Sequence, residues 1–323
     1  MTVLRPWSVV LGLCLACPAV AAAQTTHLLV ITGASGAPAH AKKVHDLATR
    51  FIDAAKKTNG VTDATLTYLA EKVETDAQRI GGRSTKENIA KAFADIAGRA
   101  RPDDAIFVLL IGHGSSPDPR TGAFNVPGPD LTAADYATLM SKWPTQRVVF
   151  INAASASGAF LPTVAGPGRI IVTATRNGRE NLETRFPKYF VEAYESEAAD
   201  TDRNGRVSVA EAFEYAKTMV AKEFEQEGHL LTEHATLDDG SEGSVAATVF
   251  LASGAVQAAS NYDMSNPGVK GLLEERDALE RQVAGLRLRK DGMNPEEYER
   301  ELERLLIALA QKSQALQTFE VKK

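Results

Sequence analysis

Five short apolar runs that alternate with segments of helical periodicity constrain the fold of this chain more than any other feature. The five apolar runs are His27–Gly33, Ala64–Glu71, Ala105–Gly114, Arg147–Ala153 and Arg169–Thr175. The segments with helical periodicity between them are Pro38–Lys57, Ser84–Ala100 and Thr132–Lys142. This alternation predicts an α/β fold with a mostly parallel sheet and helices on both of its faces. In such sheets, functional residues follow the carboxyl ends of the strands.

The first 23 residues have the pattern of a signal peptide. Arg5 supplies a positive charge, Val9–Cys17 form a short apolar core, and an A-x-A pattern favours cleavage after Ala23. The core is too short, and Pro18 interrupts it too soon, to predict a membrane span, and no later run is long enough. We therefore expect an exported chain, periplasmic or secreted, with no transmembrane span after cleavage.

Both cysteines of the chain, Cys14 and Cys17, lie in this signal segment. The mature chain is therefore expected to have no disulfide, no cysteine-ligated metal and no cysteine nucleophile. A lipoprotein anchor at Cys17 is the weaker alternative, since Cys14 stands where a lipobox has leucine. The formal net charge of −5, without a basic stripe, argues against a general nucleic-acid binder.

Two strand ends carry side chains suited to catalysis. The third run ends in Gly-His113-Gly114, and the flanking glycines allow the backbone to approach a ligand closely. The N–H of Gly114 is a candidate oxyanion donor. The fourth run ends in small residues that deliver Ser155 to the same expected edge of the sheet.

Taken together, these strand ends resemble the legumain-like, caspase-fold (clan CD) cysteine peptidases. In that family a His-Gly ends one strand and an Ala-Cys-x-Ser-Gly ends the next; the counterparts here are His113-Gly114 and Ala154-Ser155-Ala156-Ser157-Gly158. The resemblance extends over residues 27–175 and implies a caspase-like α/β domain. It also implies that Ser155 replaces the nucleophilic cysteine.

This replacement favours a pseudo-peptidase. A serine hydroxyl needs a positioned base and a third group that orients the base, whereas a thiol needs less help. The resemblance implies that the family's histidine need not be tightly hydrogen-bonded to the nucleophile at rest, which suits serine poorly. We therefore expect a peptide-binding or scaffolding module of the cell envelope, in which the cleft still holds an extended peptide at a sheet edge.

The alternative is an active serine-type hydrolase or peptidase with Ser155 as nucleophile and His113 as base. Small residues flank Ser155, as they do in a nucleophile elbow. The α/β-hydrolase order of nucleophile, acid and base would instead require a histidine after Ser155. Only His229 and His234 qualify, and His234 lies close in sequence to the acidic pair 238–239.

Two loops are further candidates for ligand binding. The resemblance implies that the segment after the fifth run helps to form a substrate pocket, with Arg176, Arg179 and Glu180 as recognition residues; a solvated loop is the alternative. The turn Thr32–Gly36, with Glu71 at the end of the second run, is similar to a dinucleotide-binding turn. Its third glycine is missing, so no nucleotide cofactor is expected.

The segment DTDRNGRVSVAE, residues 200–211, matches a calcium-binding loop position by position. Gly205 would make the sharp turn, and an N-capped helix start is the alternative interpretation. The motif predicts a structural Ca²⁺ site in which six residues offer side-chain or carbonyl oxygens: Asp200, Asp202, Asn204, Arg206, Ser208 and Glu211. The acidic stretch 237–244 is too short for the same pattern, and whether it binds a second ion is left open.

The end of the chain differs in kind. We expect one domain over residues 24–258 that includes the calcium loop, with a late strand at 244–252, then a linker at 259–268 and an antiparallel helical hairpin, or coiled coil, at 269–323. Heptad spacing supports the hairpin; its positions are Val269, Leu272, Leu279, Val283, Leu286, Tyr298, Leu302, Leu305, Leu309, Leu316 and Phe319. The two helices are expected to pack on each other, and self-association or docking of a protein partner is the alternative.

Overall fold

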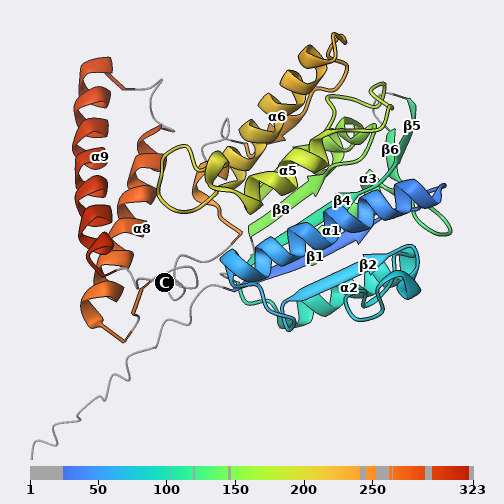
Figure 1. The fold of residues 1–323 in the computed structure, drawn as a ribbon, viewed down its shortest axis with the longest axis horizontal. Helices are drawn as coiled ribbons and strands as arrows, with labels where there is room; N and C mark the ends of the chain where they lie inside the picture. The colour runs from blue at the N-terminus through green and yellow to red at the C-terminus, as the bar shows by residue number, and fades with distance from the viewer. Residues whose placement is uncertain are drawn as a thin grey trace, which may run out of the picture.

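The structure is a computed structural model that describes residues 25–102, 104–118, 121–144, 147–240, 245–251, 262–263, 265–287 and 293–319. Its centre is a seven-stranded sheet in the order β10-β9-β8-β4-β1-β2-β3 (Figure 1). All neighbouring strands are parallel except β10 and β9, which are antiparallel. The predicted α/β fold with a mostly parallel sheet is therefore confirmed.

Each of the five apolar runs of the sequence forms a strand of this sheet. They are β1 (Thr26–Thr32), β2 (Leu66–Ala70), β4 (Ala105–Ile111), β8 (Arg147–Asn152) and β9 (Arg169–Thr173). Every residue of β1 and β4 is buried, as expected for central strands that are covered on both faces. Two very short edge strands complete the sheet: β3 (Gly82–Arg83) and β10 (Thr236–Asp238).

A small antiparallel sheet follows β4 directly. It consists of β5 (Gly114–Asp118), β6 (Thr121–Phe124) and β7 (Leu131–Thr132). The backbone N–H of Asn125 donates to the carbonyl of His113 at 3.0 Å. This sheet thus lies beside the carboxyl end of β4, where the candidate histidine lies.

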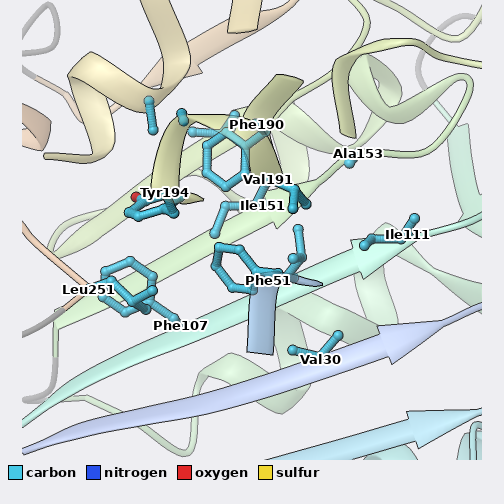
Figure 2. Packing of buried hydrophobic residues seen from close by; sticks show 14 of the residues in the cluster. Val30, Phe51, Phe107, Ile111, Ile151, Ala153, Phe190, Val191, Tyr194 and Leu251 are labelled. Carbon is cyan, nitrogen blue, oxygen red and sulfur yellow. The ribbon is translucent and has the colours of Figure 1, made fainter. Parts of the chain in front are cut away.

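One face of the main sheet is covered by α1 (Pro38–Asn59), α5 (Phe186–Glu195) and α6 (Val209–Gln226). Phe51 of α1 packs edge-on against Tyr194, with ring centroids 5.4 Å apart, and lies 6.3 Å from Phe190 (Figure 2). Apolar side chains of the strands, such as Phe107 and Ile151, belong to the same cluster as these rings. Burial of this aromatic layer fixes α5, and with α5 the loop that precedes it, against the sheet.

The opposite face is covered by α2 (Lys86–Arg99), α3 (Ala133–Met140) and α4 (Leu161–Val164). Phe93 stacks on Trp143 with centroids 4.4 Å apart, and Tyr136 packs between Phe93 and Phe150. The two faces therefore have separate cores, and the strands between them are held from both sides.

The predicted strand at 244–252 is wrong. Its described residues contain a turn of 3₁₀ helix, η4 (Ala246–Thr248), because the carboxylate of Asp239 accepts a hydrogen bond from Ala246 N (2.8 Å) and caps that turn. Phe250 makes only an isolated bridge with Ser208. Other 3₁₀ turns of the described residues are η1 (Val73–Thr75), η2 (Ser157–Phe160) and η3 (Glu197–Ala199).

Near the end of the chain, α8 (Pro267–Arg287) and α9 (Pro295–Gln317) pack side by side, away from the main sheet (Figure 1). Buried side chains lie at both ends of this helical pair: Val269, Leu273, Val283, Leu286, Leu305 and Leu316. Leu273, which the heptad assignment omits, is more buried than Leu272, and Phe319 is 38% exposed although the pattern places it in the seam. Within the described residues, no helix is long and apolar enough to cross a membrane.

Candidate functional site

His113 and Ser155 lie at the same edge of the sheet, as the sequence predicts. β4 and β8 are parallel neighbours, with Leu110 opposite Asn152. His113 follows the end of β4 by two residues and Ser155 follows the end of β8 by three. Parallel register therefore brings these two segments together beyond the carboxyl ends of the strands.

The hydroxyl of Ser155 is bonded to the backbone of Gly114. Its Oγ accepts a hydrogen bond from Gly114 N (3.1 Å) and donates one to Gly114 O (3.1 Å). The residue is only 3% exposed. The N–H expected to stabilise an oxyanion is thus already used by the candidate nucleophile itself.

Close backbone contacts fix the turn around Ser155. A Cβ at Gly114 would lie 2.2 Å from the Ser155 carbonyl oxygen, and a Cβ at Gly158 would lie 2.2 Å from the Arg176 carbonyl carbon. Ala156 adopts φ 54°, which is unfavourable for a residue with a side chain. Packing around the turn therefore holds Ser155 in one conformation.

His113 is directed elsewhere. Its ring stacks on that of His40, with centroids 4.0 Å apart and an interplanar angle of 15°. Within the described part of the chain, no hydrogen bond joins the His113 ring to Ser155 or to a carboxylate. Ser155 and His113, the nucleophile and base of the hydrolase alternative, are therefore not hydrogen-bonded to each other in this structure.

A charged group supports this histidine stack. Glu183 lies 3.4 Å from His40 Nδ1 and 2.6 Å from Lys43 Nζ. The Lys43 hydrogen bond holds the pKa of Glu183 below its usual value, while burial and the neighbouring His113 lower the pKa of His40. No motif of the sequence indicates His40, Lys43 or Glu183. For His40 and Lys43 the signal was position, because the first turns of α1 follow β1 at the same edge.

The loop after β9 is braced by Glu180. Its carboxylate accepts from Arg176 N (3.0 Å) and lies 2.8 Å from His234 Nδ1, and its carbonyl accepts from Ala156 N (2.8 Å). Arg176 and Arg179 are exposed at this edge. Among the described residues, His234 forms its ion pair with Glu180 and not with the acidic residues 238–239. Residues 236–238 form β10, which runs antiparallel to β9, so residue 238 lies opposite Ile171, away from this loop.

Behind this loop, Glu233 is a buried carboxyl group. It accepts hydrogen bonds from the backbone N–H groups of Arg185 and Phe186, both at 2.8 Å, at the start of α5. Burial raises its pKa to about 7, although these two bonds act in the opposite direction. Glu233 was not singled out from the sequence, and its role is to tie the segment before β10 to α5.

The turn Thr32–Gly36 is hydrogen-bonded to the carboxylate of Glu71. The Ser35 backbone N–H and hydroxyl both donate to the carboxylate of Glu71, with the N–H bond at 3.3 Å. A phosphate at this turn would have to displace that carboxylate. Glu71 therefore acts here as a partner of the turn rather than as a ribose-binding acid.

The acidic loop brings three carboxylates together. Oxygen atoms of Asp200, Asp202 and Glu211 all lie within 4.8 Å of one another. Gly205 makes the turn at φ 80°. Partial removal from water, followed by repulsion from Glu211, raises the pKa of Asp202 to about 7. A bound cation would relieve this repulsion, and carboxylate oxygens are ligands that Ca²⁺ prefers.

The remaining predicted ligands follow the same loop. Asn204 Oδ1 accepts from Arg206 N (2.8 Å). Ser208 begins α6 in a capping box, in which Ser208 Oγ accepts from Glu211 N (3.2 Å) and Glu211 Oε2 accepts from Ser208 N (2.9 Å). The capped helix start and the calcium motif thus coexist, since Glu211 Oε1 faces the loop and accepts from Thr201 N (3.0 Å). Of the acidic stretch 237–244, only residues up to Gly240 are described, and they do not test a second ion site.

The family model for the peptidase C13 family matches residues 42–238, which include His113 and Ser155. The chain belongs to the peptidase C13 family. This is the legumain-like family that the two strand ends indicate, so that prediction is confirmed. No curated protein is similar enough in sequence to this C13-family chain to count as a match.

Solved structures with a similar course of the chain include caspases. drICE matches with a TM-score of 0.41 and 10% identity over 67% of this chain and 87% of its own. Caspase-1 of Spodoptera frugiperda matches with a TM-score of 0.42 and 14% identity over 67% and 86%. A protein of Geobacter sulfurreducens matches with a TM-score of 0.42 and 10% identity over 66% and 92%.

Proposed function

We propose that this C13-family protein is an exported pseudo-peptidase that binds an extended peptide, or serves as a scaffold, in the cell envelope. One observation carries the proposal: the Ser155 hydroxyl and the Gly114 N–H satisfy each other. A serine nucleophile needs a base within hydrogen-bond reach and a free oxyanion donor. Here the hydroxyl proton points to a carbonyl oxygen, which is not a base.

Peptide binding is the part of the family's activity that this geometry can retain. The groups around Ser155 present exposed side chains, including Arg176 and Arg179, above the carboxyl ends of the strands. A peptide held there needs surface complementarity and backbone hydrogen bonds, and neither requires an activated nucleophile. We assign Arg176, Arg179 and Glu180 to ligand contact, with Glu180 shaping the loop from within.

The test compares labelling with binding. The wild-type chain is incubated with a fluorophosphonate probe and with peptide and ester substrates, next to Ser155→Ala and a control, Ser115→Ala, on the exposed part of β5. We expect no adduct and no turnover, and equal peptide affinity in all three proteins. An acyl or phosphonyl adduct on Ser155, absent from Ser155→Ala, would overturn the proposal.

A second candidate, an active serine hydrolase, is favoured by a different observation. The carboxylate–imidazole pair Glu180–His234 is connected to the Ser155 turn through the bond from Ala156 N to Glu180 O. The chain order Ser155, Glu180, His234 is that of nucleophile, acid and base in α/β-hydrolases. Hydrolysis that is lost in both Ser155→Ala and His234→Ala would favour this function, whereas loss in His113→Ala would favour His113 as the base.

We further propose that the acidic loop holds a structural Ca²⁺ ion. Asp200, Asp202 and Asn204 would supply side-chain oxygens, and Arg206 its carbonyl oxygen. Ser208 would supply an oxygen directly or through water, and Glu211 its carboxylate. The convergence of three carboxylates supports the site.

Calcium at millimolar concentration should raise the melting temperature of the wild type. The increase should disappear in Asp200→Asn. The increase should persist in Glu214→Gln, a control that also removes one negative charge but lies one turn of α6 beyond Glu211. Equal melting temperatures with calcium and with a chelator would remove the calcium site.

Export is the remaining part of the proposal. Cleavage after Ala23 would give a mature chain that starts with Gln24 and contains no cysteine. The intact mass of protein recovered from the periplasm or the medium checks this directly. Retention of the first 23 residues, or a lipid adduct on Cys17, would contradict it.

A further inference from the structure

Arg206 connects the acidic loop to the helical pair α8–α9. The residue is only 6% exposed, although it belongs to a surface loop. Its guanidinium lies 3.9 Å from the centroid of the Phe250 ring and forms an ion pair with Glu280 of α8. The backbone carbonyl of this same residue is a predicted calcium ligand. In the proposed site, this residue would offer its main-chain carbonyl to the ion, while its side chain contacts α8.

The α8 end of this contact is also buried. The Glu280 side chain is 11% exposed and lies 3.6 Å from Arg276 Nε, whose residue is 6% exposed. Charges removed from water in this way are stable only while their partners stay in place. The position of α8 therefore depends on where the loop holds Arg206.

Backbone contacts make the loop and its neighbouring segment one unit. Ser208 bridges Phe250, and Val209 N donates to Val249 O at 2.9 Å. The segment 249–250 is thus fixed against the loop. A change in the backbone at positions 204–206 would move both the guanidinium and the aromatic ring that supports it.

A cavity separates the loop from the second helix of the pair. Its volume is about 490 Å³, and it is lined by Asp202 and Asn204 of the loop and by Leu306 and Leu309 of α9, among others. α9 is thus not packed tightly against the loop. The close connection of the loop is to α8, through the ion pair between Arg206 and Glu280.

We infer that calcium binding to the acidic loop and docking of the α8–α9 pair are thermodynamically coupled through the Arg206–Glu280 ion pair. The inference rests on the proposed calcium site. An ion that takes the carbonyl of Arg206 and the side chain of Asn204 as ligands fixes the backbone from which the guanidinium extends. Docked α8 in turn holds that backbone ready for the ion. Coupling of this kind is reciprocal, so each event must favour the other by the same factor.

The experiment uses the full mature chain and two measurements, calcium affinity by titration calorimetry and amide hydrogen exchange of α8 and α9 with and without calcium. The variants are Glu280→Gln and Arg206→Met, which remove the ion pair from either side and keep every proposed calcium ligand. The control is Glu301→Gln, which removes an equal charge from α9, where Glu301 pairs with Arg304. Circular dichroism of each variant confirms that the sheet domain is folded.

We expect calcium to slow exchange in α8 and α9 of the wild type and of Glu301→Gln. In Glu280→Gln and Arg206→Met the slowing should be lost, and calcium should bind about tenfold more weakly, within the usual range of coupling between sites. If all four proteins bind calcium equally and calcium changes no exchange rate in α8 or α9, the coupling is wrong and the calcium site stands. If the wild type binds no calcium, the calcium site is wrong and the coupling falls with it.

Discussion

The edge around Ser155 and the acidic loop differ in how their polar groups are satisfied. At the edge, the Ser155 hydroxyl and the Gly114 backbone satisfy each other. In the loop, the three carboxylates also accept backbone hydrogen bonds, but they converge, and partial removal from water followed by repulsion from Glu211 raises the pKa of Asp202. A site whose groups are already paired has little left to offer a reaction, whereas a site with unrelieved repulsion gains free energy when a cation arrives.

The two regions also differ in packing, and the largest effect we expect follows from it. A Cβ at Gly114 would lie 2.2 Å from a backbone oxygen, whereas a Cβ at Gly205 meets no atom within 4 Å. Gly114→Ala should therefore lower the free energy of unfolding by about 3 kcal/mol or more, because backbone must move. Gly205→Ala, strained only by its φ of 80°, should cost about 1 kcal/mol.

Denaturant unfolding of both glycine variants, in the presence of a chelator, measures this difference. Equal losses would mean that the turn around Ser155 adapts as easily as the surface loop. In that case the Ser155–Gly114 bonds would be no argument against catalysis.

The next effect concerns pH and Glu233, whose burial raises its pKa from 4.5 to about 7. The folded state then binds a proton more tightly than the unfolded state does. Stability is therefore fully present below pH 4.5 and falls as the pH rises through 7, by about 3 kcal/mol. Glu233→Gln should remove this dependence, while Glu225→Gln on the exposed side of α6 should keep it. Unfolding curves between pH 4.5 and 8 would contradict the assignment if the Gln variant kept the wild-type slope.

A carboxylate at the opposite edge of the sheet should behave in the reverse way. Asp104 is buried, yet hydrogen bonds from the backbone of Arg101 and Thr25 outweigh that burial and lower its pKa from 3.8 to about 2. Its contribution is present above pH 4 and is lost as the pH falls through 2, by about 2 kcal/mol. Asp104→Asn should therefore be less stable than the wild type at pH 6 and nearly equal to it near pH 2. A constant difference across this range would argue that packing, not charge, explains the loss.

The fold was predictable where burial leaves a regular pattern in the sequence. The runs that form β1 and β4 are continuous because both faces of those strands are covered. The edge strands β3 and β10 and the small sheet β5–β7 were missed, because strands of two to five residues with exposed positions carry no such periodicity. In the helical pair, heptad counting selected Leu272 where the structure buries Leu273, since a straight helix drifts relative to a seven-residue repeat.

The site was predictable only in part, for a different reason. His113 and Ser155 follow neighbouring strands, so topology alone brings them to one edge. His40, Glu183 and Glu233 reach the same region from elements far apart in the sequence, and packing of α1 and α5 decides their positions. Likewise, the local sequence does not predict the ion pair between Arg206 and Glu280, which are 74 residues apart.

The smallest effect distinguishes the two roles of the loop. Ser208 caps α6 and is also a proposed calcium ligand, whereas Thr132 caps α3 in the same kind of capping box, with Asp135. With a chelator present, Ser208→Ala and Thr132→Ala should each lower the free energy of unfolding by about 1 kcal/mol, because each leaves a backbone N–H of its helix uncapped.

In the presence of calcium, only Ser208→Ala should also reduce the stabilisation that the ion gives, since it removes an oxygen from the loop as well as a cap. The measurement is the calcium-induced shift in melting temperature of both variants. Identical shifts would assign Ser208 to the helix alone and reduce the proposed calcium ligands to the residues before it and Glu211.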